Sequence, residues 1–405
     1  MSLEHRDYQG RVVSEIKELL QENDEAAMVI GCGGGKTVAS LQVADWFRTE
    51  FRPGAKILVL THNMSSLRDQ YYRDALDYKK MTGSTIKVEK VEHVSDLVNK
   101  HAISDLVVTL PKTLEDYKNY PHFDLVICDE AHHYMLEKTV QRIIKKVGAE
   151  KVLGLTGTPA PLILKKWPLS VASMLEMYPE NVANFTIEVV SSSYDADIEQ
   201  IDLHNGEIKD AFVDEIMGEK PTRDTLKDLL KYLVKRLKAM GHPESLFLTG
   251  WTAVFGVIGK TLISCKSQRQ AQEVVKALGE DRCLLCTSEA LNPQKADEMF
   301  RGFQGLDSEG KPDLKNTLYH HPVLVVVNRG ILGFNYPGLL NVIDMTCSTN
   351  LSKIFQLMSR VVRPYKRKRK LFLKVAPHLG DGCEGTDYYE YVMTAVLCLT
   401  HERWL

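Results

Sequence analysis

A glycine-rich loop between an apolar stretch and an amphipathic stretch constrains the fold of this chain more than any other feature. Residues 27–30 are expected to form a strand, and residues 36–49 are expected to form a helix. Between them lie Gly31, Cys32, Gly33, Gly34 and Gly35, and the helix opens with Lys36 and Thr37. Glycines let the backbone turn tightly and point successive N–H groups at one anion, and the helix N-terminus adds a partial positive charge. A strand–loop–helix unit of this kind predicts a phosphate site in an α/β fold.

The two residues after the loop indicate which phosphates are bound. Lys36 can reach the β- and γ-phosphate oxygens of a nucleoside triphosphate, and the Thr37 hydroxyl can coordinate Mg²⁺. The pattern is the short form G-x-G-K-T, because Ile30 stands where the longer form has its first glycine. A glycine-rich turn followed by a chance Lys-Thr pair is the alternative, and the strand and helix on either side disfavour it.

A pair of acidic residues follows another apolar run. Residues 125–128 are expected to form a strand, and an Asp-Glu-Ala-His sequence that contains Asp129, Glu130 and His132 follows it. Parallel α/β sheets bind ligands at the carboxyl ends of their strands, so Asp129 can hold Mg²⁺ and Glu130 can orient and deprotonate an attacking water. Two adjacent carboxylates repel a triphosphate unless a cation lies between them, so Mg²⁺ is part of the prediction. On its own, the same sequence would also suit an ordinary helix start.

Strand-like and helix-like segments alternate over two parts of the chain. The alternation over residues 1–190 predicts a first α/β lobe around a parallel sheet, and a second series over residues 259–405 predicts another lobe of this kind. Residues 191–258 are expected to be a linker and a helical segment. Leucines at three- and four-residue steps over residues 225–240 predict an amphipathic helix there, which either packs on the second lobe or serves as an arm that grips a nucleic acid.

The charge balance does not indicate that the chain as a whole binds polyanions. Lys and Arg number 51 and Asp and Glu number 53, which gives a net charge of −2. Any surface for a nucleic acid must therefore be a local patch. One basic run, at residues 366–370, suits a solvated turn, a nucleic-acid patch or a localisation signal.

The cysteines and the lack of long apolar runs indicate a location for the protein. Eight cysteines are spread along the chain, several of them inside strand-like runs, as expected for free thiols in a reducing compartment. Cys283 and Cys286 have no second pair and no nearby histidine, so a core strand is favoured over a zinc or redox site. Residues 1–20 lack the apolar stretch of a signal peptide, and no run approaches the ~20 apolar residues of a membrane helix. We therefore expect a soluble cytoplasmic protein without a membrane partner.

The order of these motifs resembles that of the DEAH-type superfamily 2 helicases. The likeness is greatest to the branch that contains the motor subunits of type I and type III restriction enzymes and phage DNA-remodelling helicases. The resemblance runs through almost the whole chain and implies two tandem RecA-like P-loop lobes with parallel sheets. It also implies an ATP hydrolase that uses ATP and Mg²⁺ and that translocates on or unwinds nucleic acid, with DNA favoured over RNA. Partner proteins are expected to supply any further activity, such as cleavage.

Motif by motif, the resemblance assigns further residues of the first lobe. Arg6 would stack on the adenine base, and Gln9 would read the edge of the base. Coupling of hydrolysis to movement of the lobes is assigned to His132, Thr156 and Thr158. Contacts with the nucleic acid are assigned to Thr61, His62, Gln70 and Thr109. Leu110 occupies the position of the family's usual threonine, with Thr109 beside it.

The second lobe carries the remaining assignments. Nucleic-acid contacts are assigned to Lys266 and Asn328, and nucleotide contacts to Gly333 and Asn335. The segment with Gln356, Arg360 and Arg363 is similar to the family pattern Q-x-x-G-R-x-x-R, with Ser359 in place of its glycine. The two arginines are three residues apart and are expected to share one helix face, from which they would reach the γ-phosphate. Together with Lys36 and Glu130, these residues form the expected catalytic set.

Three interpretations remain open at this point. A DNA-dependent translocase follows from the family branch, and an RNA helicase would use the same motifs. An ATP-controlled switch within a larger complex is the third. In each case the catalytic parts are divided between the lobes, so hydrolysis is expected to be fast only when the lobes close. A nuclease is not favoured, because no carboxylate–carboxylate–lysine cluster stands outside these motifs.

Overall fold

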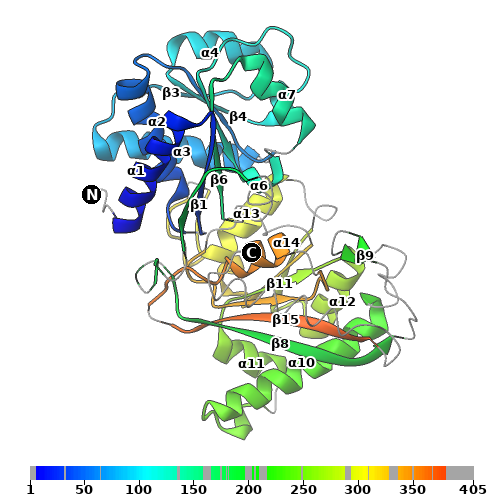
Figure 1. The fold of residues 1–405 in the computed structure, drawn as a ribbon. Helices are drawn as coiled ribbons and strands as arrows, with labels where there is room; N and C mark the ends of the chain where they lie inside the picture. Colours follow the sequence, from blue (N-terminus) through cyan, green and yellow to red (C-terminus); the bar gives the residue numbers. More distant parts are fainter. Residues whose placement is uncertain are drawn as a thin grey trace. The chain divides into compact units, whose positions relative to one another are not determined.

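The computed structural model divides the described part of the chain into two compact units (Figure 1). The first unit extends to Tyr178 and the second begins at Pro179. The residues that the structure describes are 6–31, 33–63, 65–134, 137–157, 166–173, 176–178, 180, 182–196, 203–204, 207–208, 217–247, 250–287, 293–308, 310–327, 336–348, 351–366 and 368–379.

The first unit contains a seven-stranded parallel sheet with the strand order β3-β4-β2-β5-β6-β1-β7. Its strands are β1 (Glu25–Ile30), β2 (Ile57–Leu60), β3 (Val88–Lys90), β4 (Leu106–Thr109), β5 (Leu125–Asp129), β6 (Lys151–Thr156) and β7 (Leu169–Ala172). Strands β2 and β4 are buried along their whole length, which is typical of a parallel sheet with both faces covered.

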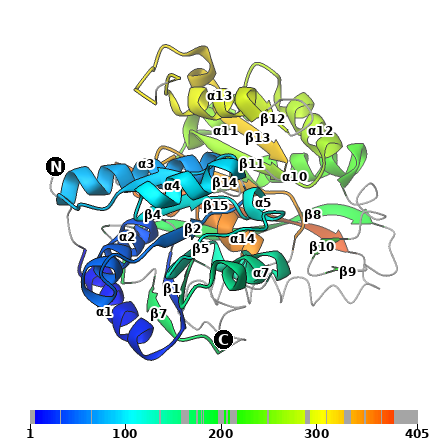
Figure 2. The same cartoon turned by 90° about the horizontal axis from the view of Figure 1, so that it is seen from above.

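Helices cover both faces of this sheet. They are α1 (Asp7–Glu22), α2 (Lys36–Trp46), α3 (Ser65–Thr82), α4 (Leu97–Ile103), α5 (Pro111–Leu114), α6 (Ala131–Tyr134) and α7 (Lys138–Val147), and a π-helical turn, Phe47–Phe51, continues α2. Figures 1 and 2 show α1 and α2 on one side of the sheet and α7 on the other. Helix α7 buries Val140, Ile143 and Val147 in a core that also holds Val126 and Val152 of the sheet.

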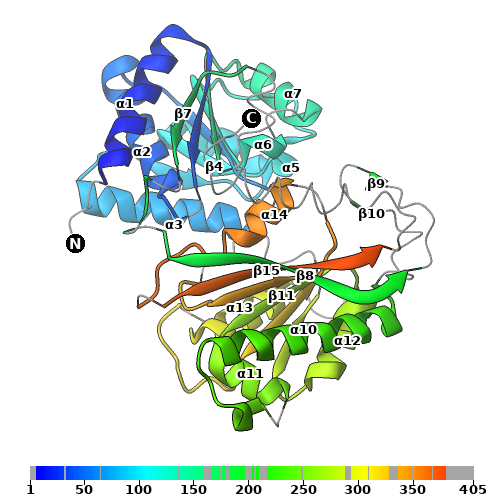
Figure 3. The same cartoon turned by 60° about the horizontal axis from the view of Figure 1, so that its bottom comes forward.

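The second unit contains a six-stranded parallel sheet with the strand order β12-β13-β11-β14-β15-β8 (Figure 3). Its strands are β8 (Phe185–Ala196), β11 (Thr261–Cys265), β12 (Cys283–Cys286), β13 (Val323–Val327), β14 (Asn341–Asp344) and β15 (Lys370–Leu379). Its helices are α10 (Glu219–Ala239), α11 (Trp251–Ile258), α12 (Gln268–Leu278), α13 (Pro293–Gln304) and α14 (Leu351–Met358). A separate antiparallel hairpin joins β9 (Leu203–His204) and β10 (Glu207–Ile208). The two parallel α/β sheets confirm the predicted fold class.

The boundary between the units differs from the one predicted at residue 190. Strand β8 starts at Phe185, and it pairs with β15 of the second sheet rather than with the first sheet. The leucines of α10, in the segment expected to lie between the lobes, are also buried in the core of the second unit together with Ile263 and Val325. A strand does not encode its pairing partner locally, so periodicity alone could not place this boundary. The helix itself occurs where the leucine spacing predicts it, and it packs on the second sheet.

The sequence predicts that no helix of this chain spans a membrane. None of the helices in the described ranges is both long and apolar enough to cross a bilayer.

A buried ion pair joins two neighbouring strands of the second sheet. Lys374 Nζ on β15 lies 2.7 Å from Asp344 Oδ2 at the end of β14, and the exposed fractions of the two side chains are 0% and 1%. The other carboxylate oxygen, Oδ1, accepts hydrogen bonds from the backbone N–H and the hydroxyl of Thr346. The pair therefore joins β14, β15 and the loop that leads from β14 towards α14.

We predict that Lys374→Met lowers the free energy of unfolding of the second unit by about 3–5 kcal/mol, because it leaves a buried carboxylate without its partner. The double variant Lys374→Met/Asp344→Asn should recover much of this loss, since no uncompensated charge remains. Urea denaturation of both variants and the unmodified protein measures the two differences. Equal destabilisation by the single and double variants would contradict the electrostatic explanation.

Candidate nucleotide-binding site

The glycine loop connects β1 to α2 in the first unit, as the sequence predicts. Gly33 and Gly35 have φ angles of 82° and 87°, in the left-handed region that glycine adopts without strain. A Cβ atom on Gly35 would lie 2.1 Å from the side-chain nitrogen of Gln9, and one on Gly34 would lie 2.4 Å from Cγ2 of Ile30. Close packing therefore favours glycine at both of these positions, and at Gly35 the backbone shape favours it as well. Cys32 lies outside the described residues.

Side chains from the start of the chain bind the backbone of this loop. Arg6 donates from Nη1 to the Gly33 carbonyl at 3.1 Å and to the Tyr8 hydroxyl at 2.9 Å. The Tyr8 hydroxyl and Gln9 Nε2 both donate to the Gly34 carbonyl, at 2.9 Å and 2.8 Å. Arg6 and Gln9, which the sequence assigns to the adenine base, therefore also bind the backbone of the glycine loop. Tyr8 is a member of this set that sequence reasoning missed, although its place between Arg6 and Gln9 was a usable signal.

The predicted acidic pair lies at the carboxyl end of β5. Glu130 has a φ of 52°, which is unusual for a residue other than glycine and marks local strain. Its backbone N–H donates to Asp129 Oδ1 at 3.0 Å, and its Oε1 lies 3.9 Å from Nζ of Lys36. The structure therefore brings together Lys36, Asp129 and Glu130, which the sequence assigns to one site.

The electrostatics of the site raise the pKa of Asp129. Burial, followed by the nearby charge of Glu130, raises the pKa of this carboxyl from its ordinary value to about 6, and Lys36 opposes the shift. The carboxylate is thus incompletely stabilised by the groups of the protein around it.

The residues assigned to coupling also meet in the structure. Nδ1 of His132 and Oγ1 of Thr156 share a hydrogen bond of 2.7 Å, and both side chains are buried. The same ring nitrogen lies 3.5 Å from Oε2 of Glu130. A chain of polar contacts therefore runs from the acidic pair after β5 to the end of β6. Thr158 lies outside the described residues.

A buried hydroxyl pair supports the first turn of α2. The Ser40 hydroxyl donates to the Thr37 carbonyl at 2.8 Å, and the Tyr71 hydroxyl of α3 lies 2.8 Å from the Ser40 oxygen. Burial raises the pKa of Tyr71, so this phenol remains protonated and can donate. These contacts hold the turn that carries Lys36 and Thr37, and sequence reasoning did not identify them.

The residues of the first unit that the sequence assigns to nucleic acid differ in how exposed their side chains are. His62 and Gln70 are partly exposed. The side chains of Thr61 and Thr109 are fully buried, and the Thr109 hydroxyl donates to the Val91 carbonyl at 3.0 Å. Thr61 follows β2 and Thr109 ends β4, both with buried side chains, and their contacts with nucleic acid stay a prediction. The loops that follow them remain at the edge of the sheet.

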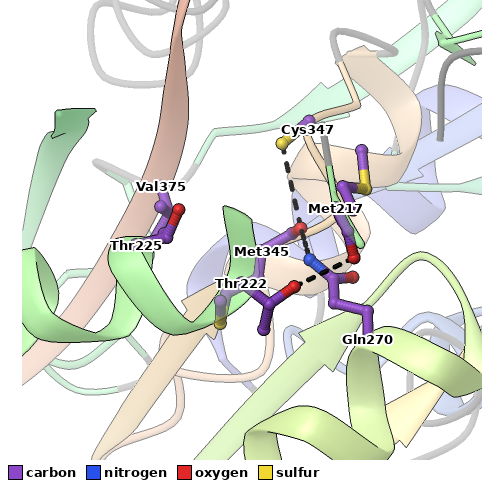
Figure 4. Close-up of a pocket in the computed structure, with 7 residues that line it drawn as sticks. All are labelled: Met217, Thr222, Thr225, Gln270, Met345, Cys347 and Val375. Atoms are coloured by element: carbon purple, nitrogen blue, oxygen red, sulfur yellow. Dashed lines mark hydrogen bonds between the residues drawn. The ribbon is translucent and has the colours of Figure 1, made fainter. Parts of the chain in front are cut away.

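In the second unit, a buried glutamine connects two loops at the carboxyl edge of the sheet (Figure 4). Oε1 of Gln270 accepts the backbone N–H of Lys266 at 2.7 Å, and its Nε2 donates to the Met345 carbonyl at 2.9 Å. Lys266 is an assigned nucleic-acid contact, and Met345 begins the loop that leads towards α14. Sequence reasoning missed Gln270, although a polar residue on the apolar face of α12 was a signal.

The space beside Gln270 is too small for a ligand. It measures about 10 Å³, which is roughly the room that one water needs. Its lining consists of Met217, Thr222, Thr225, Gln270, Met345, Cys347 and Val375. The contacts in Figure 4 therefore serve the structure of the loops rather than a separate binding site.

The segment with the predicted arginines departs from the expected helix. Helix α14 ends at Met358, and the backbone turns at residues 359–361, so Arg360 and Arg363 do not share the face of one continuous helix. Arg360 is 8% exposed and Gln356 is 5% exposed, while Arg363 is partly exposed. The Ser359 hydroxyl donates to the Gln356 carbonyl at 2.5 Å, which shows why a small polar residue suits the turn. Asn328, Gly333 and Asn335 lie outside the described residues.

Comparisons with known proteins agree with this arrangement. The family described as type III restriction enzyme, res subunit, matches residues 2–161. A protein of Acanthamoeba polyphaga mimivirus, described as an ATP-dependent RNA helicase, is 27% identical over 153 residues, which is 37% of this chain and 27% of that protein.

Two solved structures cover nearly the whole chain. A fragment described as an HsdR subunit of a type I restriction enzyme from Vibrio vulnificus superposes with a TM-score of 0.60 at 17% identity, over 95% of this chain and 65% of the fragment. The type ISP restriction-modification enzyme LlaBIII bound to DNA gives 0.65 at 13% identity, over 100% of this chain and 30% of that enzyme. The two parallel-sheet α/β units therefore have the helicase-like RecA fold of these structures. The match spans less than two thirds of the length of each of these three proteins.

The helicase-like fold explains why the predicted residues gather where they do. In each unit the carboxyl ends of the parallel strands meet at one edge of the sheet, so loops that are distant in sequence lie together there. The glycine loop, the acidic pair and Thr156 share that edge of the first sheet, and Lys266 and Met345 share it in the second.

We predict a pH-dependent effect of Asp129→Asn on the stability of the nucleotide-free protein. The ordinary pKa of an aspartate is about 4, so between about pH 4 and pH 6 the folded chain holds a proton that the unfolded chain has released. Stability therefore falls as the pH rises through that window. The asparagine variant should melt above the unmodified protein at pH 7.5 in EDTA, and this difference should vanish near pH 4. Asp77→Asn, at an exposed position, is the control, and a pH-independent difference for Asp129→Asn would contradict the assignment.

We further predict that Gln270→Ala destabilises the second unit by about 1–3 kcal/mol, because the Lys266 N–H and the Met345 carbonyl lose their partner in a buried setting. The matched control is Gln272→Ala, two residues along the same helix and exposed, which should stay within about 0.5 kcal/mol of the unmodified protein. Chemical denaturation measures both. Equal effects of the two variants would show that Gln270 has no bridging role.

Proposed function

We propose that this chain is a nucleic-acid-dependent ATPase of the DEAH type within superfamily 2, and that it translocates on or remodels DNA. The observation that carries the proposal is the meeting of Lys36 and Glu130 beside the glycine loop, with 3.9 Å between their charged groups. This places a cation for the terminal phosphates next to a carboxylate that can take a proton from water.

The donor set suits a nucleoside triphosphate with Mg²⁺. Thr37 offers a hydroxyl and Asp129 offers a carboxylate, and Mg²⁺ in phosphate sites takes oxygen ligands of this kind. The raised pKa of Asp129 supports this choice, because a bound divalent cation would supply the compensation that the surrounding side chains do not. Held by Thr37 and Asp129, Mg²⁺ would supply positive charge that neutralises the charge developing on the phosphates.

The remaining residues have roles that follow from their chemistry. Glu130 would orient and deprotonate the attacking water, and the contacts from Glu130 through His132 to Thr156 would pass a change at the acidic pair to the end of β6. Arg360 and Arg363, with Gln356 beside them, would stabilise charge on the γ-phosphate during turnover. An arginine in this role contributes ~10³–10⁵ in rate.

DNA is proposed as the substrate because of the restriction-enzyme likeness. The matching family and two structural neighbours are described as restriction enzymes, and one of these neighbours was solved bound to DNA. RNA is the second candidate, because the mimivirus relative is described as an RNA helicase. Partner proteins are proposed for any further activity, such as cleavage.

We predict that Glu130→Gln and Arg360→Ala each lower kcat for ATP by at least about 10²-fold while nucleotide binding stays within a few-fold of the unmodified protein. The first change removes the base and the second removes charge stabilisation, whereas Lys36 and the glycine loop still hold the phosphates. A fluorescent ATP analogue measures binding, and phosphate release measures turnover. Lys231→Gln, an exposed change on α10, is the control and should leave both unchanged.

The choice of substrate is tested in the same assay with single-stranded DNA, duplex DNA, forked DNA and RNA. Stimulation of the ATPase by DNA supports the proposal. Stimulation by RNA alone would instead show that the protein is an RNA helicase. An ATPase rate that ignores all four would overturn both in favour of an ATP-controlled switch. In that case Glu130→Gln would retain a protein partner regardless of nucleic acid instead of trapping nucleic acid with ATP.

A further inference from the structure

Helix α7 of the first unit has an unusually one-sided charge. Between Lys138 and Val147 it carries four basic residues and no acidic residue, although acidic residues slightly outnumber basic ones in the whole chain. Its apolar face is buried in the core of the first unit. The residues on its opposite, exposed face are Lys138, Gln141, Arg142, Lys145 and Lys146. We call these five residues the basic face of α7.

Two cations of the surface helix α10 form ion pairs with acids on the same helix. On α10, Lys227 Nζ lies 2.8 Å from Asp224, and Lys231 Nζ lies 3.3 Å from Asp228. Within the described ranges, no cation of the basic face of α7 forms an ion pair. Arg142 donates only to the Glu115 carbonyl at 3.2 Å, and Lys146 lies over the ring of Tyr120 at 5.5 Å. Because α7 carries four exposed cations and no acid of its own, this face has a local positive potential that attracts an anionic partner.

The spacing of these cations suits a phosphate backbone. Lys138, Arg142 and Lys145 follow the i, i+4, i+7 pattern of one helix face, and they span about 10 Å at ~1.5 Å of rise per residue. One nucleic-acid strand advances about 3.4 Å per nucleotide in a duplex, so this span corresponds to about three phosphates. The long flexible side chains can adjust to a backbone of either DNA or RNA.

The position of α7 connects this face to a loop already assigned to nucleic acid. Helix α5 packs against α7, and Figure 2 shows the two helices side by side. On α5, Lys112 is exposed, and its backbone N–H donates to Oδ1 of Asn63 at 2.9 Å. Asn63 follows His62 in the loop after β2. The exposed Asn63 and Lys112 are thus joined by a hydrogen bond, and the α5 segment that carries Lys112 contacts the basic face through Arg142, which donates to the Glu115 carbonyl just after α5.

We propose that the basic face of α7 binds the phosphate backbone of the nucleic acid on which the protein acts, as an extension of the contact made by the loop after β2. This inference rests on the proposed nucleic-acid-dependent function. An acidic protein is the other chemical class that such a face could attract. Protein interfaces, however, have cores depleted of charge and enriched in aromatic residues, and every residue on the exposed face of α7 is polar.

The test compares two triple variants that remove the same number of charges. The first replaces Lys138, Arg142 and Lys145 of α7 by Gln, and the control replaces Lys227, Lys231 and Lys235 of α10 by Gln. Binding of labelled single-stranded DNA, duplex DNA and RNA is measured over a range of salt concentrations. The α7 variant should weaken binding on the order of 10²-fold at 0.1 M salt and should lower the slope of log K against log salt by about 2–3. The α10 control should match the unmodified protein.

A charge-preserving variant keeps the test informative if the Gln variant folds poorly. Exchanging Lys138 and Lys145 for Arg, and Arg142 for Lys, should retain the slope and affinity of the unmodified protein. Melting temperatures of all variants check the fold.

The outcomes separate the inference from the function on which it rests. If the unmodified protein binds no nucleic acid, the proposed function fails. If it binds and the α7 variant keeps the slope of the α10 control, the inference fails while the function stands. If polyglutamate and unlabelled DNA of equal charge displace the labelled nucleic acid equally effectively, the basic face of α7 binds acidic proteins. The inference is then likewise overturned.

Discussion

The packing of the glycine loop against the start of the chain is the constraint on which the candidate site depends. The Gly34 carbonyl accepts hydrogen bonds from both Tyr8 and Gln9, and a side chain on Gly35 would displace the Gln9 amide. The shape of the loop is therefore held by a tertiary contact as well as permitted by glycine. This contact fixes the position of the loop and Lys36 at the carboxyl edge of the first sheet. Asp129 and Glu130 lie at the same edge.

Both units use buried polar contacts to connect the loops at the ends of their strands. In the first, the hydrogen bond between His132 and Thr156 links the segments after β5 and at the end of β6. In the second, Gln270 links the loops after β11 and β14, and the Lys374–Asp344 pair joins β14 to β15. Buried polar groups are costly unless they are fully paired, so such contacts favour one arrangement of the loops over nearby alternatives. Residues with proposed chemical roles are thus held in place partly by residues, such as Gln270, for which no such role is proposed.

Short motifs allowed part of the site to be predicted. The other parts depend on burial and on contacts between distant residues, which short motifs do not encode. Lys36, Asp129 and Glu130 were predictable because the phosphate loop and the acidic strand end are local patterns with a direct chemical meaning. The burial of the Thr61 and Thr109 hydroxyls was not predictable, because the orientation of a side chain at or just after a strand end depends on its neighbours. Tyr8 and Gln270 were missed because their importance lies in contacts with residues 26 and 75 positions away.

The sequence by itself determined that the chain forms two parallel α/β sheets, that a glycine-rich loop follows the first strand, and that adjacent carboxylates lie at the end of another strand. Those features follow from local periodicity and from glycine and charge placement, which act over a few residues. Only the tertiary structure decided that β8 pairs with β15, that the helix before the two arginines ends at Met358, and that the four cations of α7 are exposed. Such outcomes depend on which segments meet in space, and that choice is made by packing over the whole unit rather than by any one stretch of the chain.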